Sequence, residues 1–133
     1  MVSEEVVEGV MRSALNSISK KDNISLKDLR IKMELNDSKN SVECSILEGT
    51  EYKNDLSWSR ILGMKVVFSN IIIDTIKKSL MRISRENNIE ADDINARIYA
   101  IDENGTPNIY IYNAKKPLRK IELSEILQNY LVK

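Results

Sequence analysis

Carboxylates crowd one short segment of this 133-residue chain, where Asp92 and Asp93 follow Glu86 and Glu90. Oxygen ligands of this kind bind divalent cations, and calcium loops place them at alternating positions around a glycine that permits a sharp bend. This segment has neither the glycine nor the alternating spacing. Because aspartate in turns commonly accepts hydrogen bonds from nearby backbone, we interpret Asp93 as part of a turn between a helix and a strand. We therefore predict no metal site.

Nucleophilic and general-base chemistry has few residues available to it. The chain contains no histidine, which is the commonest general base, and its one cysteine is Cys44. Cys44 falls at an apolar position of a predicted strand, where a buried thiol is inert. No glycine-rich phosphate-binding loop and no GxSxG serine motif occurs. The sequence predicts a protein that is not an enzyme and that needs no cofactor.

Nucleic-acid binding has one candidate segment, a basic cluster after two tyrosines that consists of Lys115, Lys116, Arg119 and Lys120. Basic groups beside aromatic side chains are typical of proteins that bind single strands. The chain as a whole has 20 basic and 20 acidic side chains, so its formal net charge is zero. A single short cluster offers few phosphate contacts, and we keep nucleic acid only as a third hypothesis.

Length and composition are typical of a single domain spanning residues 1–133. The chain is 42% hydrophobic and 30% charged, which is too apolar for disorder. Its first residues lack the basic segment and apolar core of a signal peptide. The longest apolar-rich run, residues 61–73, is interrupted by Lys65 and is too short to span a bilayer. We expect a cytoplasmic protein that does not bind membranes.

Two amphipathic helices are predicted from apolar residues at helical spacing, the first from Ser3 to Ser19 and the second from Arg60 to Glu86. Each helix precedes segments in which apolar and polar residues alternate, as in half-buried strands. These strands are expected near residues 29–35, 42–46, 94–101 and 108–112. Asn104-Gly105 between the last two is a strong hairpin signal.

Three further segments give weaker signals. Residues 49–58 show no period and are interpreted as a connection. Pro117 excludes a central strand, although an edge strand over residues 119–123 remains an alternative to a loop. Ser124 can cap a C-terminal helix over about residues 124–132.

The two helix-hairpin segments resemble each other at one constant offset in residue number, here called the repeat offset, which carries Ile18 onto Ile83. ISKKDNISLKDL, at residues 18–29, matches ISRENNIEADDI, at residues 83–94. The repeat offset also aligns polar residues, because Ser19 meets Ser84 and Asn23 meets Asn88. Similarity at a fixed period is typical of repeated units. We interpret residues 3–48 and 68–113 as two copies of one αββ unit, with chance similarity as the alternative.

The predicted fold is therefore α+β. One helix and one hairpin bury too little surface to be stable alone. Two tandem αββ units are expected to merge into a four-stranded antiparallel sheet, or a five-stranded one if the edge strand forms. The helices are expected on one face of the sheet, with the C-terminal helix packed at an end or edge.

Apolar residues on the second helix exceed what one contact with the sheet requires. Leu62, Val66 and Ile73 form a second stripe, and Trp58 lies just before it. Exposed apolar patches mark association sites, and tryptophan is enriched among binding anchors. The alternative is that the C-terminal helix covers this stripe.

The sheet face opposite the helices is the other candidate surface. Alternation would place aromatic and charged side chains there, namely Tyr99, Ile101, Tyr110 and Tyr112 beside Lys32, Glu34 and Arg97. A mixed surface with aromatic residues suits contact with protein.

The functional prediction is a non-catalytic protein-interaction or assembly module, acting as a homodimer or with another protein partner. Its candidate interaction surface consists of Trp58, Leu62, Val66, Ile73, Tyr99, Tyr110 and Tyr112. The alternative is a small-molecule-binding domain, or a minor enzyme, with a pocket between the two αββ halves. Nucleic-acid binding through the basic cluster is the third hypothesis.

Overall fold

The structure is a computed structural model and describes residues 3–36, 38–62 and 66–126. These residues form, in order, α1 (Glu4–Asp22), β1 (Leu29–Asn36), β2 (Ser41–Glu48), β3 (Glu51–Leu56), α2 (Trp58–Leu62), α3 (Val66–Glu86), β4 (Ile94–Ala100), β5 (Pro107–Asn113), β6 (Lys116–Ile121) and α4 (Leu123–Ile126). The strands form one open antiparallel sheet in the order β3-β2-β1-β4-β5-β6. The structure confirms the predicted α+β class and antiparallel sheet. It also confirms that the chain begins with a helix followed by two strands.

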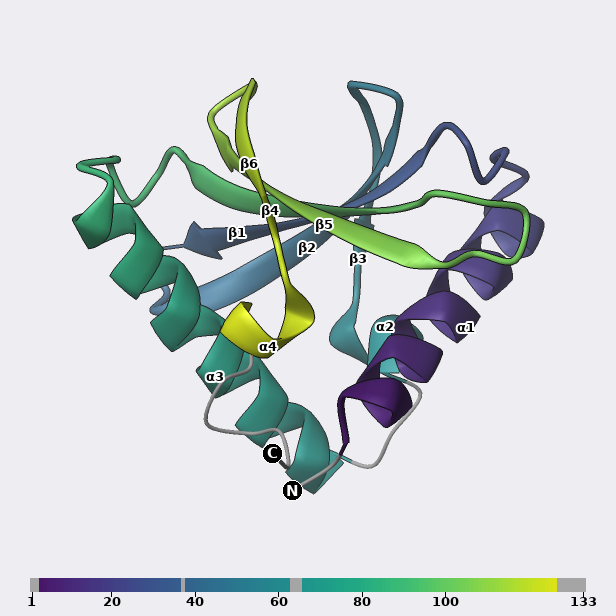
Figure 1. Cartoon of the computed structure of the whole chain (residues 1–133), viewed down its shortest axis with the longest axis horizontal. Helices are drawn as coiled ribbons and strands as arrows, with labels where there is room; N and C mark the ends of the chain where they lie inside the picture. The colour runs from purple at the N-terminus through teal and green to yellow at the C-terminus, as the bar shows by residue number, and fades with distance from the viewer. Residues whose placement is uncertain (1–2, 37, 63–65, 127–133) are drawn as a thin grey trace.

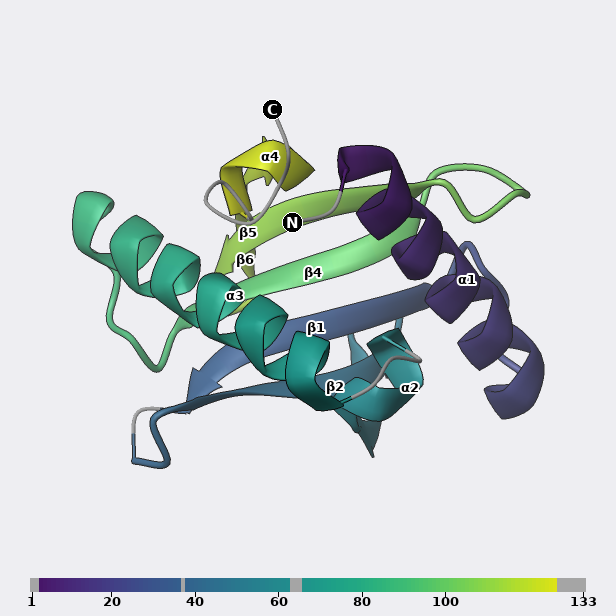
Figure 2. The ribbon, with the colours of Figure 1, turned by 90° about the horizontal axis from the view of Figure 1, so that it is seen from below.

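The helices lie on one side of the sheet. Figure 1 shows α1 and α3 descending from opposite ends of the sheet, with the turns after β2 and after β5 projecting on the other side. Figure 2, seen from the helix side, shows α1 and α3 crossing the central strands β1 and β4. The expectation that the helices cover one face is therefore confirmed, and none of the helices in the described part of the chain lies on the opposite face.

Helix α1 begins at the residue that its capping signal predicts. The side-chain oxygen of Ser3 accepts a hydrogen bond from the backbone N–H of Val6 at 3.3 Å, which satisfies one of the free donors at the helix start. The predicted end at Ser19 is about one turn early, because Lys20 and Lys21 are good helix formers. The helix ends at Asn23, whose backbone is left-handed with φ of 55°.

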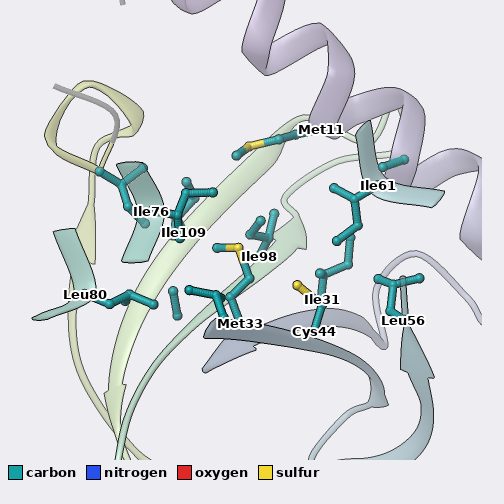
Figure 3. Close-up of a cluster of buried hydrophobic side chains, with 14 of the residues drawn as sticks. Met11, Ile31, Met33, Cys44, Leu56, Ile61, Ile76, Leu80, Ile98 and Ile109 are labelled. Atoms are coloured by element: carbon teal, nitrogen blue, oxygen red, sulfur yellow. The ribbon is translucent and has the colours of Figure 1, made fainter. Parts of the chain in front are cut away.

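The core lies between the sheet and the helices. Figure 3 shows side chains of β1 and β4, including Ile31, Met33 and Ile98, gathered with side chains that descend from the helices. Ile76 and Leu80 of α3 are 2% and 0% exposed. Burying side chains of this size stabilises the fold by roughly 1.5–3 kcal/mol each before conformational entropy is subtracted.

The prediction of four or five strands is wrong, because the residues that the structure describes form a sheet of six strands. The missed strand β3 occupies most of the predicted connection, residues 49–58. It lies at the edge of the sheet, and only Leu56 of its residues is buried, so it lacks an apolar alternation that the sequence could reveal. At the opposite edge, β6 forms at Lys116–Ile121, slightly earlier than the alternative edge strand at residues 119–123. Pro117 lies in this edge strand, where a missing N–H is tolerated.

The predicted second helix corresponds to two helices, α2 and α3, separated by residues 63–65, which lie outside the described residues. The predicted C-terminal helix begins as α4 at Leu123, and its remaining part, residues 127–132, also lies outside the described residues.

Several contacts in the described chain occur twice, between residues that the repeat offset relates. The side chain of Ser19 donates to the backbone oxygen of Ile24 at 2.6 Å, and that of Ser84 donates to the backbone oxygen of Ile89 at 2.5 Å. Both bonds close the chain just after a helix. The backbone N–H of Gly49 reaches the oxygen of Asp28 at 2.6 Å, and that of Ala114 reaches Asp93 at 2.7 Å.

The repeated pattern is longer than the predicted αββ unit. The bulge in the β2–β3 pair, after Ile46, has its counterpart in the β5–β6 pair after Ile111. The repeat offset also carries the start of β3 onto the start of β6, and the start of α2 onto the start of α4. The recurring order is αβββα, and the predicted tandem αββ units lacked the third strand and the short helix.

Candidate functional site

The sheet face opposite the helices, here called the open face, presents its side chains in rows across the sheet. The strand register places the middle row in the order Asp55, Ser45, Lys32, Arg97, Tyr110 and Lys120. One flanking row contains Glu43, Glu34, Asn95 and Tyr112. The other contains Tyr52, Leu47, Arg30, Tyr99 and Asn108.

Lys32 and Arg97 lie opposite each other at the centre of the open face. The repeat offset carries Lys32 onto Arg97, and their neighbours Ile31 and Met33 pair with Ile98 and Ala96. The central strand pair is therefore arranged about an approximate two-fold axis that runs through Lys32 and Arg97, perpendicular to the sheet.

Arg97 is a buried cation held by neutral groups. It is 5% exposed, its Nε donates to Asn95 Oδ1 at 3.1 Å, and its Nη2 donates to the backbone oxygen of Ala114 at 3.3 Å. Its guanidinium lies over the Tyr112 ring, 4.0 Å from the ring centre. Burial lowers the pKa of Arg97, but arginine stays protonated in proteins. Arg97 therefore fixes a positive charge below Tyr112.

The three predicted tyrosines lie together on the open face, as alternation indicated. The ring centres of Tyr99 and Tyr110 are 5.7 Å apart, and the guanidinium of Arg30 lies 4.6 Å from the centre of the Tyr99 ring. Asn108 donates to the Tyr99 hydroxyl at 3.2 Å. Each tyrosine is half-buried, so part of every ring remains available for contact. Ile101, expected beside them, lies in the bend after β4 and is 59% exposed.

A cavity of about 540 Å³ opens on this face. Its lining includes three cations and five carboxylates, namely Lys32, Arg97 and Lys115 with Glu34, Glu43, Asp55, Asp92 and Asp93. Lys32 is paired with Glu34 at 3.3 Å. The cavity is thus polar and of mixed charge.

The two edges of the open face carry opposite charges. The repeat offset carries Asp55 on β3 onto Lys120 on β6, so the two residues occupy equivalent places in the two halves. Glu43 adds negative charge on the β2 side, and Lys120 lies beside Tyr110 on the other. The open face is therefore acidic toward β3 and both aromatic and basic toward β6.

The projecting turns of the two hairpins stand at diagonally opposite corners of the open face. The turn after β2 lies near the start of β1, because Leu29 pairs with Glu48. The turn after β5 lies near the start of β4, because Ile94 pairs with Asn113. Since β1 and β4 are antiparallel, these two ends are opposite, so the two projecting turns lie on a diagonal of the open face.

The predicted interaction surface is divided by the sheet. The tyrosines lie on the open face, whereas Trp58 and Ile73 belong to α2 and α3 on the other side. Trp58 is half-buried against the core, and its Nε1 donates to the backbone oxygen of Val42 at 3.0 Å. Ile73 is also half-buried. The side chains of Leu62 and Val66 lie outside the described residues.

The predicted basic cluster spans the β5–β6 turn and the edge strand β6. Arg119 forms two bonds with Glu125, at 2.6 and 3.1 Å, which raise the pKa of Arg119. Lys120 lies 3.7 Å from Glu122, while Lys115 and Lys116 are exposed. Half of the cluster thus has a nearby carboxylate, which reduces the charge available to a phosphate backbone.

The predicted turn containing Asp92 and Asp93 is present before β4, and the backbone oxygen of Asp93 accepts the Ala114 N–H. Among the described residues, no three histidine, cysteine or acidic side chains are placed to hold one metal ion. Cys44 is buried, and burial is the main cause that raises the pKa of its thiol, so it is held in the unreactive protonated form.

Sequence reasoning missed the contribution of Glu43, Tyr52 and Asp55 to the open face. Tyr52 and Asp55 lie in the strand that was predicted as a connection, and the Tyr52 hydroxyl donates to Asp55 at 2.9 Å. The repeat offset could have revealed them, because it aligns residues 51–56 with the basic edge strand.

No protein-family model, curated protein or solved structure matches this chain. Within the part that the structure describes, no helix combines the length and the apolar character needed to cross a membrane.

Proposed function

We propose that this protein is a non-catalytic interaction module that assembles as a homodimer through the open face. The observation that carries this proposal is the opposite charge of Asp55 and Lys120 at equivalent edges of one surface. A surface whose two halves are complementary to each other can bind a second copy of itself. The absence of histidine from the sequence and the burial of Cys44 support a role without catalysis.

The proposed dimer has a two-fold axis that lies between the two open faces and runs parallel to the central strands. This rotation places each row of side chains against the same row of the second copy. It also places the β3 edge of one copy against the β6 edge of the other. Asp55 of each copy then faces Lys120 of the other, and Arg30 of each copy faces Tyr99 of the other. The alternative axis, across the strands, would bring Asp55 against Asp55 and is disfavoured by repulsion.

The corner positions of the hairpin turns support contact between two open faces, and either axis satisfies them. Each copy has projecting turns at two diagonal corners. The proposed rotation places the turns of the second copy at the other two corners, so the four turns alternate. Near the centre, Lys32 of each copy would face Arg97 of the other, which brings two cations together. Lys32 is already paired with Glu34, and Tyr112 covers Arg97, so both charges are screened.

The affinity in this proposal comes mainly from the tyrosines. Exposed ion pairs contribute about 0.2–1 kcal/mol each, so the edge charges set orientation more than strength. Half-buried tyrosines combine apolar contact area with a hydroxyl that can bond to the partner, and they are enriched at interfaces.

Charge reversal tests the proposed pairing directly. Asp55→Lys alone and Lys120→Glu alone should each weaken self-association by roughly tenfold, because each places like charges at two symmetric contacts. A mixture of the two variants should restore association, since every contact then joins a cation to an anion. Sedimentation equilibrium of each variant and of the mixture measures these affinities.

Glu103→Lys is the matched control for the single variants. Glu103 is exposed in the turn between β4 and β5, away from the open face. It should leave the affinity unchanged although it alters the net charge by the same amount as Asp55→Lys. If the mixed variants associate no better than either variant alone, the proposed pairing is wrong.

We also propose that the chain arose by duplication of one αβββα unit. The recurring bonds after α1 and α3, at Ser19 and Ser84, support a copied unit rather than two unrelated helix-hairpins.

A further inference from the structure

A second cavity, of about 270 Å³, lies between α3 and the turn that joins β1 to β2. Leu35, Asn40 and Ser41 form one wall and come from the first half of the chain. Met81 and Ala91 form the other wall and come from the second half. Ligand pockets commonly occur at such boundaries between structural units. This cavity is separate from the open face, because α3 lies on the other side of the sheet (Figure 1).

The equivalent place in the other half of the molecule is filled by its own side chains. There α1 packs against the turn between β4 and β5. Asn16 Nδ2 donates to the backbone oxygen of Asn104 at 3.1 Å, and Arg12 Nη2 donates to Thr106 Oγ1 at 3.4 Å. A Cβ on Gly105 would lie 2.5 Å from Asn16 Nδ2, so helix and turn are in close contact.

Replaced side chains account for the difference between the two places. The repeat offset carries Asn16, which closes the first site, onto Met81, and methionine has no N–H to donate to a turn. Ala91 stands in place of Leu26. Both residues pack against the core, and the smaller side chain of Ala91 fills less space. The cavity is therefore a feature of the second site and not a general consequence of the fold.

The lining of the cavity combines an apolar interior with positive charge. Leu35, Met81 and Ala91 supply apolar surface, while Lys77 and Arg85 supply two cations. No acidic side chain is among the described lining residues. Lys77 Nζ forms an ion pair with Asp74 Oδ1 at 3.7 Å. Arg85 donates through Nε to the backbone oxygen of Met81 at 3.4 Å. The remaining guanidinium donors can receive a carboxylate.

We propose that this cavity binds a small amphipathic carboxylate. The apolar body of the ligand lies against Met81, Leu35 and Ala91, and its carboxylate lies toward Arg85 and Lys77. An apolar cavity of about 150 Å³ accommodates benzene, so the space here is sufficient for a short alkyl chain or a substituted ring. This proposal is independent of the dimer and uses a different side of the sheet.

Octanoate is a suitable probe, with octanol as the uncharged probe of the same chain length. The full chain with ¹³C-labelled methionine methyl groups would be titrated with each compound and followed by NMR. We expect a saturable shift of the Met81 methyl signal with octanoate, and binding at least fivefold weaker with octanol. The Met33 methyl is the internal control, because Met33 is 1% exposed in the core and is not part of the cavity lining.

Two variants test where octanoate binds and separate the contribution of the apolar space from that of the cation. Ala91→Leu restores the larger side chain found in the other half and should reduce octanoate binding at least tenfold by filling the cavity. Arg85→Gln should weaken octanoate binding several-fold and leave octanol binding unchanged. The absence of a saturable Met81 shift with octanoate would overturn the proposal. Equal affinity for the two probes, or unchanged octanoate binding by a folded Ala91→Leu variant, would also overturn it.

Discussion

Asn23 and Asn88 end their helices in the same left-handed backbone conformation, with φ of 55° and 56°. They are related by the repeat offset, as are the other recurring contacts of the chain. Asparagine adopts this conformation more readily than most residues, and the following residue can then bond back to the last helical turn. Ile24 and Ile89 do so, at 3.1 and 2.9 Å from Ser19 and Ser84. The same local chemistry thus stops both long helices.

A second left-handed pair gives a prediction of stability. Gly49 and Ala114 occupy equivalent turns with φ of 62° and 53°, and only glycine adopts this conformation without steric cost. Ala114→Gly should raise the free energy of unfolding by about 0.5–1 kcal/mol, since relief of the left-handed strain exceeds the added entropy of the unfolded chain. Urea unfolding measures the change. Gly49→Ala is the reverse experiment and should destabilise; a loss of stability in Ala114→Gly would contradict the account.

Much of this fold could be predicted from the sequence because the central elements have strong periodicity. Helix α1 and strands β1, β2, β4 and β5 each direct apolar side chains toward the core, so apolar residues recur at the expected spacing. The edge strands could not be recognised in this way. In β3 and β6 only the last residue, Leu56 or Ile121, is buried, and their pairing depends on backbone bonds that leave little trace in composition.

The candidate sites were predictable only in part. Alternation correctly placed Tyr99, Tyr110 and Tyr112 on one face, because a strand turns successive side chains to opposite sides. It could not reveal that Asp55 belongs to the same face, since that depends on recognising β3. The cavity beside Met81 depends on the difference between two packed turns, and no local pattern encodes such a difference.

Cys44 is predicted to be unreactive while the protein is folded. Its thiol is buried and lies near Glu34 and Glu43, whose negative charges add to the effect of burial in raising its pKa. A chromogenic disulfide reagent should react with fewer than one thiol in ten over the time in which it modifies a free cysteine completely. In urea the same reagent should react fully. Rapid modification of the native protein would show that Cys44 is accessible.

The Arg119–Glu125 pair is predicted to make stability depend on pH. The bond from Arg119 is the main cause that lowers the pKa of Glu125 below its ordinary value of 4.5. A lowered pKa in the folded state means that the stabilisation is fully present above the unfolded pKa and is lost as the pH falls through the folded value. Because the pair is partly exposed, Arg119→Gln should destabilise by no more than about 1 kcal/mol at pH 7.

Two readouts test this pair. Carboxylate NMR titration should show the pKa of Glu125 rising in Arg119→Gln, and urea unfolding at pH 7 and at about pH 3 should show the difference in stability shrinking in acid. Lys116→Gln, an exposed residue of the same strand, is the control. If wild type and Arg119→Gln differ in unfolding free energy by the same amount at both pH values, Arg119 acts through packing and the account of the ion pair is wrong.

The native mass in solution tests the central claim most directly. Light scattering behind a sizing column, over a range of loading concentrations, should give about twice the chain mass of 15.3 kDa for the wild-type protein. Tyr110→Glu, which places a charge in the middle row of the open face, should give the single-chain mass while the protein remains folded. A wild-type protein that stays at 15.3 kDa across the concentration range, or a Tyr110→Glu variant that remains fully dimeric, would contradict assembly through the open face.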